Sequence, residues 1–258
     1  MVGAGGGFVL VPVLLLLYPD RDPEEITAIS LAVVFANSVS GAAAFARQGR
    51  IDYRSGWYFA GATLPGALLG AYVVRYTPRA AFEVIFSVVL GAIGLFLLLQ
   101  QAPTGIREPE RGERGIVRRM LRDRSGQTFF YSYNLRKGVR LTAVIGFFSS
   151  LLGIGGGVIQ VPMMTTVLRF PVHIATATSQ FILAFMAGEG SIVHLVSGSL
   201  RWDESLATAG LLALGAVPGA QLGAFAARHI AAPLILRLLS VTLILVAIRL
   251  GLKAAGWF

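Results

Sequence analysis

A glycine-rich segment occurs twice in this chain, and it is the feature that most constrains the fold. The copies are Gly3–Pro12 (GAGGGFVLVP) and Gly153–Pro162 (GIGGGVIQVP), 150 positions apart. Each copy lies in apolar sequence and opens a helix-like run that carries a proline. Glycine allows a helix to break and restart, and it lets backbone amides approach a ligand closely. A helix that restarts inside a membrane points free N–H groups at whatever lies there, so the pattern is typical of an anion site at membrane depth.

The scarcity of charge places the chain in a bilayer. Only 14% of the residues are charged and the mean hydropathy is +0.71, whereas a soluble domain carries about 25% charge. Several uncharged stretches approach the roughly 20 residues that a spanning helix needs. These stretches are Ile26–Ala46, Ser55–Val74, Val84–Ala102, Leu141–Leu168 and Ser205–Ala227. The sequence therefore predicts an all-α integral membrane protein with glycine-broken helices.

The absence of cysteine narrows the chemistry. With no cysteine in the chain, disulfides, zinc–thiolate sites and thiol catalysis are excluded. The sequence also has no His-Glu-x-x-His motif. We therefore expect no catalytic residues, no metal site and no cofactor, and a protein that is not an enzyme.

Positive charge is concentrated in the middle of the chain. Residues 103–140 hold ten Lys/Arg against four Asp/Glu, which accounts for most of the net charge of +9. A basic loop between apolar spans is typical of a cytoplasmic loop, so no nucleic-acid partner is expected. This divides the chain into a first transmembrane repeat (1–101), a connecting loop (102–138) and a second repeat (139–258).

Two expectations concern the connecting loop itself. Ile116–Leu121, with its arginines, is either a short amphipathic helix on an anionic membrane surface or a solvated tether. The aromatic run Phe129–Tyr133 is expected at the membrane interface.

The duplication extends beyond the glycine segments and predicts two homologous repeats of three to four transmembrane helices each. The matched pairs are Ser30 with Ser179 and Gly41 with Gly190 at an offset of 149, and Pro65–Gly66 with Pro218–Gly219 at 153. If each glycine segment crosses the membrane, each half has four crossings and the repeats are parallel. If each is a re-entrant hairpin, each half has three crossings and the repeats are inverted. The sequence leaves both topologies open.

The first repeat differs from the second at its start. About fourteen apolar residues, Val139–Leu152, precede the second glycine segment, and nothing comparable precedes the first. We expect the chain to begin inside its first membrane element, either because the native start lies upstream or because that element is short. In the helix expected at 55–75, glycines at spacing four, Gly66 and Gly70, favour close helix packing.

Polar residues on two predicted helices could line a substrate path beside the glycine segments. Ser30, Asn37 and Gly41 share one face of helix 24–46, and Ser179 and His194 lie close together around helix 173–197. The alternative is that such residues are interhelical hydrogen-bonding groups, worth about 0.6 kcal/mol each.

Ionisable residues within apolar helices are usually functional. Glu189 and His194 are candidates for proton coupling, and at five residues apart they lie on different faces. The alternative for His194 is a helix-end position that reaches water. Glu83 and Arg237 occupy nearly equivalent repeat positions with opposite charge, so they either pair across the repeats or lie separately at a membrane surface.

The duplicated Gly-x-Gly-Gly-Gly-x(4)-Pro blocks, together with the run Tyr133–Met163, resemble the sulfite exporter TauE/SafE family of membrane permeases. The resemblance covers essentially the whole chain. It implies a multi-pass protein of the prokaryotic inner membrane that moves sulfur-containing anions such as sulfite, sulfonates or sulfoacetate.

The sequence therefore predicts a secondary transporter, expected to be an exporter, that holds a small anion between its two glycine segments and works by alternating access. The partners expected are this anion and the lipid bilayer, with proton coupling and a homodimer as secondary expectations. An anion channel, or a permease for a carboxylate, is the alternative. The expected binding residues are Gly5, Gly6, Gly7, Phe8, Gly155, Gly156, Gly157, Val158, Ser30, Asn37, Ser179 and Gln180.

Overall fold

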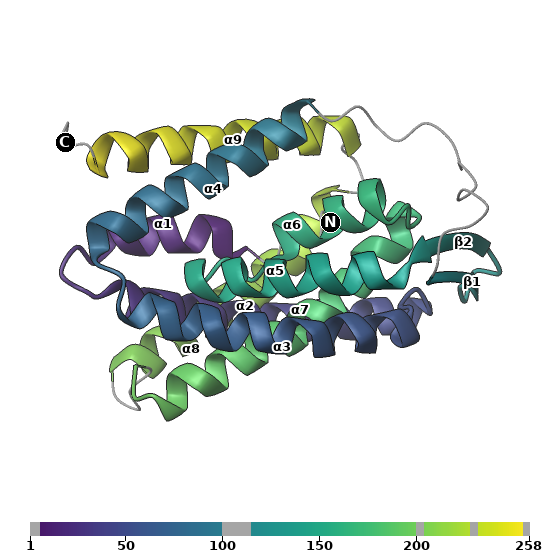
Figure 1. The fold of residues 1–258 in the computed structure, drawn as a ribbon, viewed down its shortest axis with the longest axis horizontal. Coiled ribbons are helices and arrows are strands. Elements are labelled where there is room, and N and C mark those ends of the chain that lie inside the picture. Colours follow the sequence, from purple (N-terminus) through teal and green to yellow (C-terminus); the bar gives the residue numbers. More distant parts are fainter. Residues whose placement is uncertain (1–5, 100–114, 200–203, 228–231, 255–258) are drawn as a thin grey trace.

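The computed structural model describes residues 6–99, 115–199, 204–227 and 232–254, without the side chains of residues 204, 220–227, 232–239 and 254. Figure 1 shows its elements as a bundle of helices with a two-stranded sheet at one end. The elements are α1 (Gly7–Leu17), α2 (Pro23–Gln48), α3 (Tyr53–Arg75), α4 (Arg79–Leu99), β1 (Ile116–Arg122), β2 (Thr128–Asn134), α5 (Leu135–Leu152), α6 (Gly157–Pro162), a π-helical turn (Met163–Val167), α7 (Val172–Val196), α8 (Glu204–Ala227) and α9 (Ala232–Ala254).

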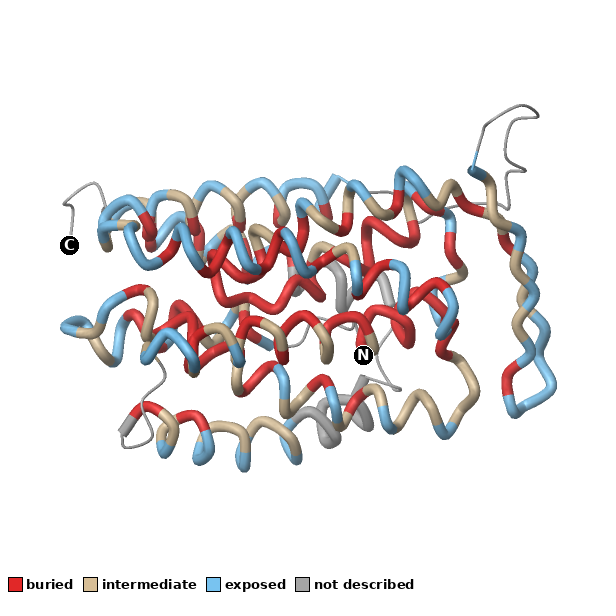
Figure 2. Tube along the Cα trace, turned by 60° about the horizontal axis from the view of Figure 1, so that its bottom comes forward, coloured by how far each residue is buried: buried red, intermediate tan, exposed pale blue. Residues whose placement is uncertain are grey.

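Helices α2, α3, α4 and α7 are each long and apolar enough to cross a bilayer. Figure 2 shows buried residues gathered in the interior of the bundle and exposed residues along its outer faces. Those outer faces are themselves apolar, with Leu69, Val88 and Leu99 more than half exposed. Exposed leucine and valine over whole helix faces are suited to lipid, which confirms a helical, multi-pass membrane protein.

The second glycine segment folds back on itself. Helix α5 begins at the sheet, and the turn at Gly153–Gly156 reverses the chain into α6. The segment after α6 returns to the start of α5, because a methyl group placed at Gly138 would lie 3.1 Å from Leu168 Cδ1. Phe170, two residues further on, packs against Tyr131 of β2. This segment is therefore a re-entrant hairpin that enters and leaves on the same side.

Helix α1 begins beside the same glycine turn and runs in the direction opposite to α6 (Figure 1). Its first residue, Gly7, lies against the backbone of Gly153 and Ile154. Near its other end, the Leu15 carbonyl accepts a hydrogen bond of 2.8 Å from Arg79, at the start of α4. The two glycine segments thus meet inside the bundle. The residues that precede Gly6 lie outside the described part, so the inverted arrangement of the two halves stays a prediction.

Helices with matching positions in the two halves contact one another. Helix α2 packs on α7 and α4 packs on α9, while α2 contacts α8 as α3 contacts α7. A duplicated chain with a two-fold relation would give this exchange of contacts, but the repeat itself stays a prediction.

Helix α5 packs tightly on α3 through glycines. A methyl group at Gly66 or Gly70 would collide with backbone atoms of α5, and one at Gly146 would lie 2.6 Å from the Thr63 carbonyl oxygen. The close approach predicted from the spacing of Gly66 and Gly70 is confirmed.

The prediction of a short amphipathic helix at Ile116–Leu121 was wrong. This segment is β1, which pairs antiparallel with β2 so that Arg119 lies opposite Tyr131. Alternate β1 residues point inward, and the turn between the strands closes with Gly126 at a φ of +89°. Period-two alternation next to a glycine turn favours a hairpin. Tyr131 and Tyr133, expected at the membrane interface, are buried against Phe170.

Candidate functional site

The turn between α5 and α6 is built from glycines that no other residue could replace without rearrangement. Gly153, Gly155 and Gly156 have φ values of +66°, +73° and +63°, a region that favours glycine. A methyl group at Gly156 would lie 2.5 Å from Met186 Cε, and one at Gly155 would collide with Val34. The turn therefore lies in direct contact with α2 and α7.

The first glycine segment repeats this local geometry, with fewer of the described residues around it. Gly6 precedes α1 with a φ of +82°, as Gly156 precedes α6. Gly7 and Gly157 are the first residues of their helices, and both are buried. Gly5 lies outside the described residues. Phe8 is partly buried and Val158 is buried.

Buried polar side chains with an unpartnered atom lie on the second glycine segment and on the helices that contact it. They come from α2, α5, α6 and α7, and each is at most 2% exposed. Buried polar groups in proteins are nearly always hydrogen-bonded, so such a group points to a ligand or a water that completes it. The side chains with an unpartnered atom are Thr27, Ser149, Ser150, Gln160, Ser179 and Gln180.

Several of these side chains are placed directly by the glycines. A methyl group at Gly153 would lie 2.9 Å from Thr27 Cα, and one at Gly156 would lie 3.2 Å from Ser149 Cβ. Gln160 donates a long hydrogen bond of 3.4 Å to Thr142, and its carbonyl oxygen has no partner. The glycines thus bring hydroxyl-bearing residues of two elements, α2 and α5, against the turn in the interior of the bundle.

The predicted polar residues have different surroundings. Ser179 and Gln180 are buried with unpartnered oxygens. Ser30 donates a hydrogen bond of 2.6 Å to the Gly153 carbonyl oxygen, so its hydroxyl holds the turn in place. Asn37 is partly buried on α2. Sequence reasoning missed Thr27, Ser149, Ser150 and Gln160, although two of them, Ser149 and Ser150, precede the glycine motif by only a few residues.

Backbone amides of the second turn are partly used. The Gly157 N–H donates to the Gly155 carbonyl oxygen at 2.8 Å, and the Gln160 N–H donates to the Gly156 carbonyl oxygen at 2.8 Å. Of the amides expected to hold an anion, that of Gly157 is therefore already engaged.

The two candidate proton carriers lie in separate networks. Glu189 accepts a hydrogen bond of 3.3 Å from Thr63 on α3 and lines an apolar cavity of about 650 Å³ between α2 and α7. His194 is fully buried and its Nδ1 lies 3.9 Å from the Glu24 carboxylate. The alternative in which His194 reaches water from the helix end is therefore wrong.

Glu83 is held within the bundle by cations other than the expected one. Its carboxylate lies 3.1 Å from Arg79 and 3.0 Å from Lys253. The side chain of Arg237 lies outside the described residues.

A second polar network, at the sheet end of the bundle, was not anticipated from the sequence. Asp52, at the start of α3, is 1% exposed and binds side chains of both strands. Burial by itself would raise the pKa of Asp52, but hydrogen bonds from Arg119, Ser55 and Tyr131 outweigh it and hold the pKa below its usual value. The carboxylate is therefore charged at neutral pH.

Comparison with known proteins agrees with this architecture. The family described as "Sulfite exporter TauE/SafE" matches residues 1–250. The probable membrane transporter protein YunE of Bacillus subtilis (strain 168) is 33% identical over 256 residues, which cover 97% of this chain and 91% of YunE. The probable membrane transporter protein YfcA of Escherichia coli (strain K12) is 22% identical over 222 residues, covering 86% of this chain and 73% of YfcA. No solved structure matches.

A family match over nearly the whole chain, and a relative of this identity and coverage, fix the classification. With its apolar helices and paired glycine segments, the chain belongs to the sulfite exporter TauE/SafE family of membrane transporters.

Proposed function

We propose that this protein is a secondary transporter of the prokaryotic inner membrane that exports a small sulfur-containing anion by alternating access. The observation that carries the proposal is the set of unpartnered buried hydroxyls on the second glycine segment and on the helices that contact it. In a membrane interior such groups are expensive unless a ligand satisfies them. The hydroxyls of Thr27, Ser149, Ser150 and Ser179 can donate hydrogen bonds to the oxygens of an oxyanion.

The composition of the site supports a small anion. The unpartnered hydroxyls belong to Ser and Thr, which carry no charge, and His194 on α7, whose ring nitrogens are also unpartnered, is the ionisable exception. Neutral donors hold a small oxyanion without trapping it, which suits a carrier that must release its substrate. Sulfite, a sulfonate or sulfoacetate fits this description.

The proposed direction of transport, export, follows from the membrane potential. With the cytoplasm negative, the membrane potential favours outward movement of an anion by about 2.3 kcal/mol per charge per 100 mV. A pore would share this preference, so the measurement that separates a carrier from a channel is counterflow, in which unlabelled substrate on one side accelerates entry of labelled substrate from the other.

The substrate class is tested by ligand-induced stabilisation and by flux. We expect sulfite, a sulfonate or sulfoacetate to raise the thermal midpoint of the purified protein, and to show counterflow in proteoliposomes. Stabilisation by carboxylates but by none of the sulfur anions would overturn the substrate class.

The position of the site is tested by two serines that differ in their hydrogen bonds. Ser149→Ala removes an unpartnered hydroxyl, so we expect KM to rise about threefold to tenfold while the thermal midpoint stays level or rises. Ser30→Ala removes the hydroxyl that supports Gly153, so we expect a loss of about 1 kcal/mol in stability. Ser191→Ala, whose hydroxyl bonds to its own helix at Ala187, is the control and should change neither. An unchanged KM for Ser149→Ala would remove this region as the binding site.

A further inference from the structure

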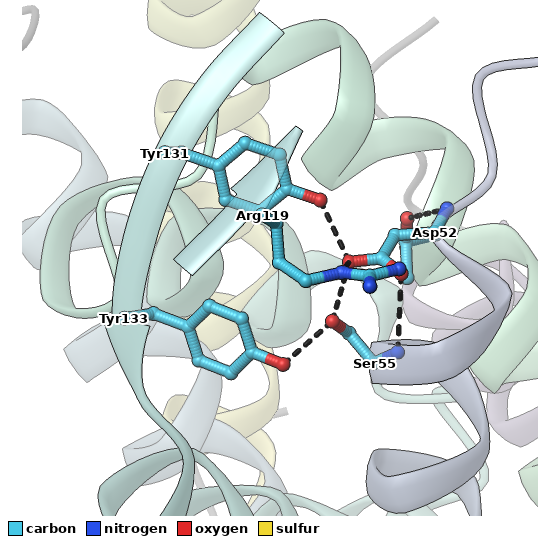
Figure 3. Close-up of polar contacts among 6 residues, drawn as sticks. Asp52, Ser55, Arg119, Tyr131 and Tyr133 are labelled. Atoms are coloured by element: carbon cyan, nitrogen blue, oxygen red, sulfur yellow. Dashed lines mark hydrogen bonds and ion pairs between the residues drawn. The ribbon is translucent and has the colours of Figure 1, made fainter. Parts of the chain in front are cut away.

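The sheet end of the bundle is fastened by a buried ion pair between the hairpin and the α2–α3 connection. Arg119 of β1 donates two hydrogen bonds to the Asp52 carboxylate, at 3.1 Å from Nε and 2.5 Å from Nη2. Tyr131 of β2 donates a third, at 2.7 Å. Ser55 also donates to Asp52, and its hydroxyl lies 2.6 Å from that of Tyr133. Figure 3 shows the side chains of both strands converging on Asp52 and Ser55.

A second set of contacts fastens the tip of the hairpin. Arg50, in the α2–α3 connection, lies 3.1 Å from the Asp123 carboxylate. The Arg124 N–H donates to the Gln48 carbonyl oxygen at 3.0 Å. The hairpin is therefore held along its length, and not only at the single buried pair.

The same carboxylate-bearing residue reaches the proposed substrate site. The Asp52 N–H donates a hydrogen bond of 3.0 Å to the hydroxyl of Thr178 on α7. Thr178 directly precedes Ser179 and Gln180, two of the unpartnered side chains. Phe181, which follows Gln180, packs edge-on against Tyr53, which follows Asp52, with 5.3 Å between the ring centroids.

The hairpin also contacts the segment that leads into α7. The rings of Tyr131 and Tyr133 each lie 4.7 Å from that of Phe170. Phe170 follows the π-helical turn and stands just before α7. Hairpin contacts therefore join a connection of the first half of the chain to the start of α7 in the second half.

Any carrier must close its site toward one side and then open it. The ion pair is suited to this because it is strong but lies near water: the Asp52 side chain is fully buried, while that of Arg119 is 22% exposed. Breaking such a pair leaves one charge buried and unpaired, so the closed arrangement is favoured until something replaces the partner. An anion arriving from the cytoplasm has the charge needed to replace Asp52 on the guanidinium.

We propose that the hairpin is the cytoplasmic gate of the transporter, closed when Arg119 and Tyr131 hold Asp52, and opened when they separate from it. Asp52 is then a positioning residue, which ties the hairpin to the α7 turn that carries Ser179 and Gln180. This inference rests on the proposed function, because the gate is taken to lead to the proposed substrate site.

The natural absence of cysteine gives a direct test. A Ser179→Cys variant carries one thiol, and a membrane-impermeant thiol reagent applied to inside-out vesicles reports its exposure to the cytoplasmic side. Adding Arg119→Gln should raise the labelling rate about tenfold, because loss of one partner destabilises the closed state. The matched control is Arg118→Gln, since Arg118 is exposed on the opposite face of the same strand and its loss should leave the rate unchanged.

Two further variants decide the outcome if Arg119→Gln does not fold. Asp52→Asn should raise labelling as Arg119→Gln does, and Tyr131→Phe should raise it less, because the ion pair remains. Unchanged labelling in the variants that fold, or an equal rise with Arg118→Gln, would overturn the gate. Labelling needs no substrate, so a rise without sulfite flux would instead count against the proposed substrate.

Discussion

The two glycine segments share a backbone conformation but differ in what surrounds them. Gly6 and Gly156 are both left-handed and both begin a helix that carries proline at its sixth residue. A methyl group at Gly156 would strike Met186, whereas one at Gly6 would have no described atom within 4 Å. The motif therefore fixes the bend of the chain, while the packing around it decides where a polar site can form.

The strongest loss of stability is expected from a substitution at Gly156, the more tightly packed of the two glycines. Gly156→Ala introduces strain from the positive φ, displaces the flexible end of Met186 and crowds Ile145 and Ser149 at 3.2 Å, so we expect a loss of about 2–3 kcal/mol in stability and a loss of transport. Gly6→Ala adds only the backbone strain, about 1 kcal/mol. Thermal unfolding in detergent and counterflow in proteoliposomes measure both variants. Equal losses in the two would show that packing does not distinguish the segments.

A smaller effect is expected where the two segments touch. A methyl group at Gly7 would lie 2.8 Å from the carbonyl oxygens of Gly153 and Ile154, so Gly7→Ala should force the segments apart. We expect a loss of about 1–3 kcal/mol in stability and reduced flux. The control is Gly61→Ala, at a glycine within α3 with no described atom within 4 Å, which should be neutral or stabilising by about 0.5–1 kcal/mol. A neutral Gly7→Ala would mean that the segments need not be in contact for transport.

Substitution of Glu189 is expected to change stability least and to act on proton coupling instead. At the repeat offset of 149, Glu189 corresponds to Ser40. At this position, therefore, only the second half carries a carboxylate. If Glu189 carries the coupled proton, Glu189→Gln should abolish the dependence of flux on a pH gradient, and Ser40→Ala should preserve it. Flux measured with and without an imposed gradient makes this comparison. A retained dependence in Glu189→Gln would exclude Glu189 as the coupling group.

Acid should weaken the hairpin contacts. Because the pKa of Asp52 lies below its usual value in the closed structure, its ion pair is fully formed at neutral pH and is lost only as the pH falls through that lowered value. The ratio of the labelling rates with and without Arg119→Gln, in which the pH dependence of the thiol itself cancels, should therefore be constant between about pH 6 and 8.

Local signals in the sequence predicted much of the fold. Uncharged runs located α2, α3, α4 and α8, and the spacing of Gly66 and Gly70 anticipated the packing on α5. The fold-back at Gly153–Gly156 could not be predicted, because a re-entrant hairpin and a full crossing can use apolar segments of similar composition.

The site was harder to predict because it depends on which hydroxyls lack partners. Ser30 and Ser179 look equivalent in the sequence, yet one bonds to the Gly153 carbonyl oxygen and the other is unpartnered. That distinction arises only when the elements are packed. The hairpin was not predicted for a different reason, because arginines between apolar spans are typical of a solvated loop. The alternation in Val117, Arg119 and Leu121 nevertheless indicates a strand with one partly buried face.

The fold-back of α5 into α6 also has a consequence for how the protein is made. Because this segment enters and leaves on one side, no part of it has to be exported across the bilayer. Its glycine turn exposes backbone groups that lipid cannot satisfy, so it is tolerable only when enclosed by protein. The walls that enclose it are α2 and α7, and α7 is synthesised after it. With the proposed orientation, in which the hairpin faces the cytoplasm, the re-entrant segment must remain at the cytoplasmic surface until α7 has been made and can enclose it.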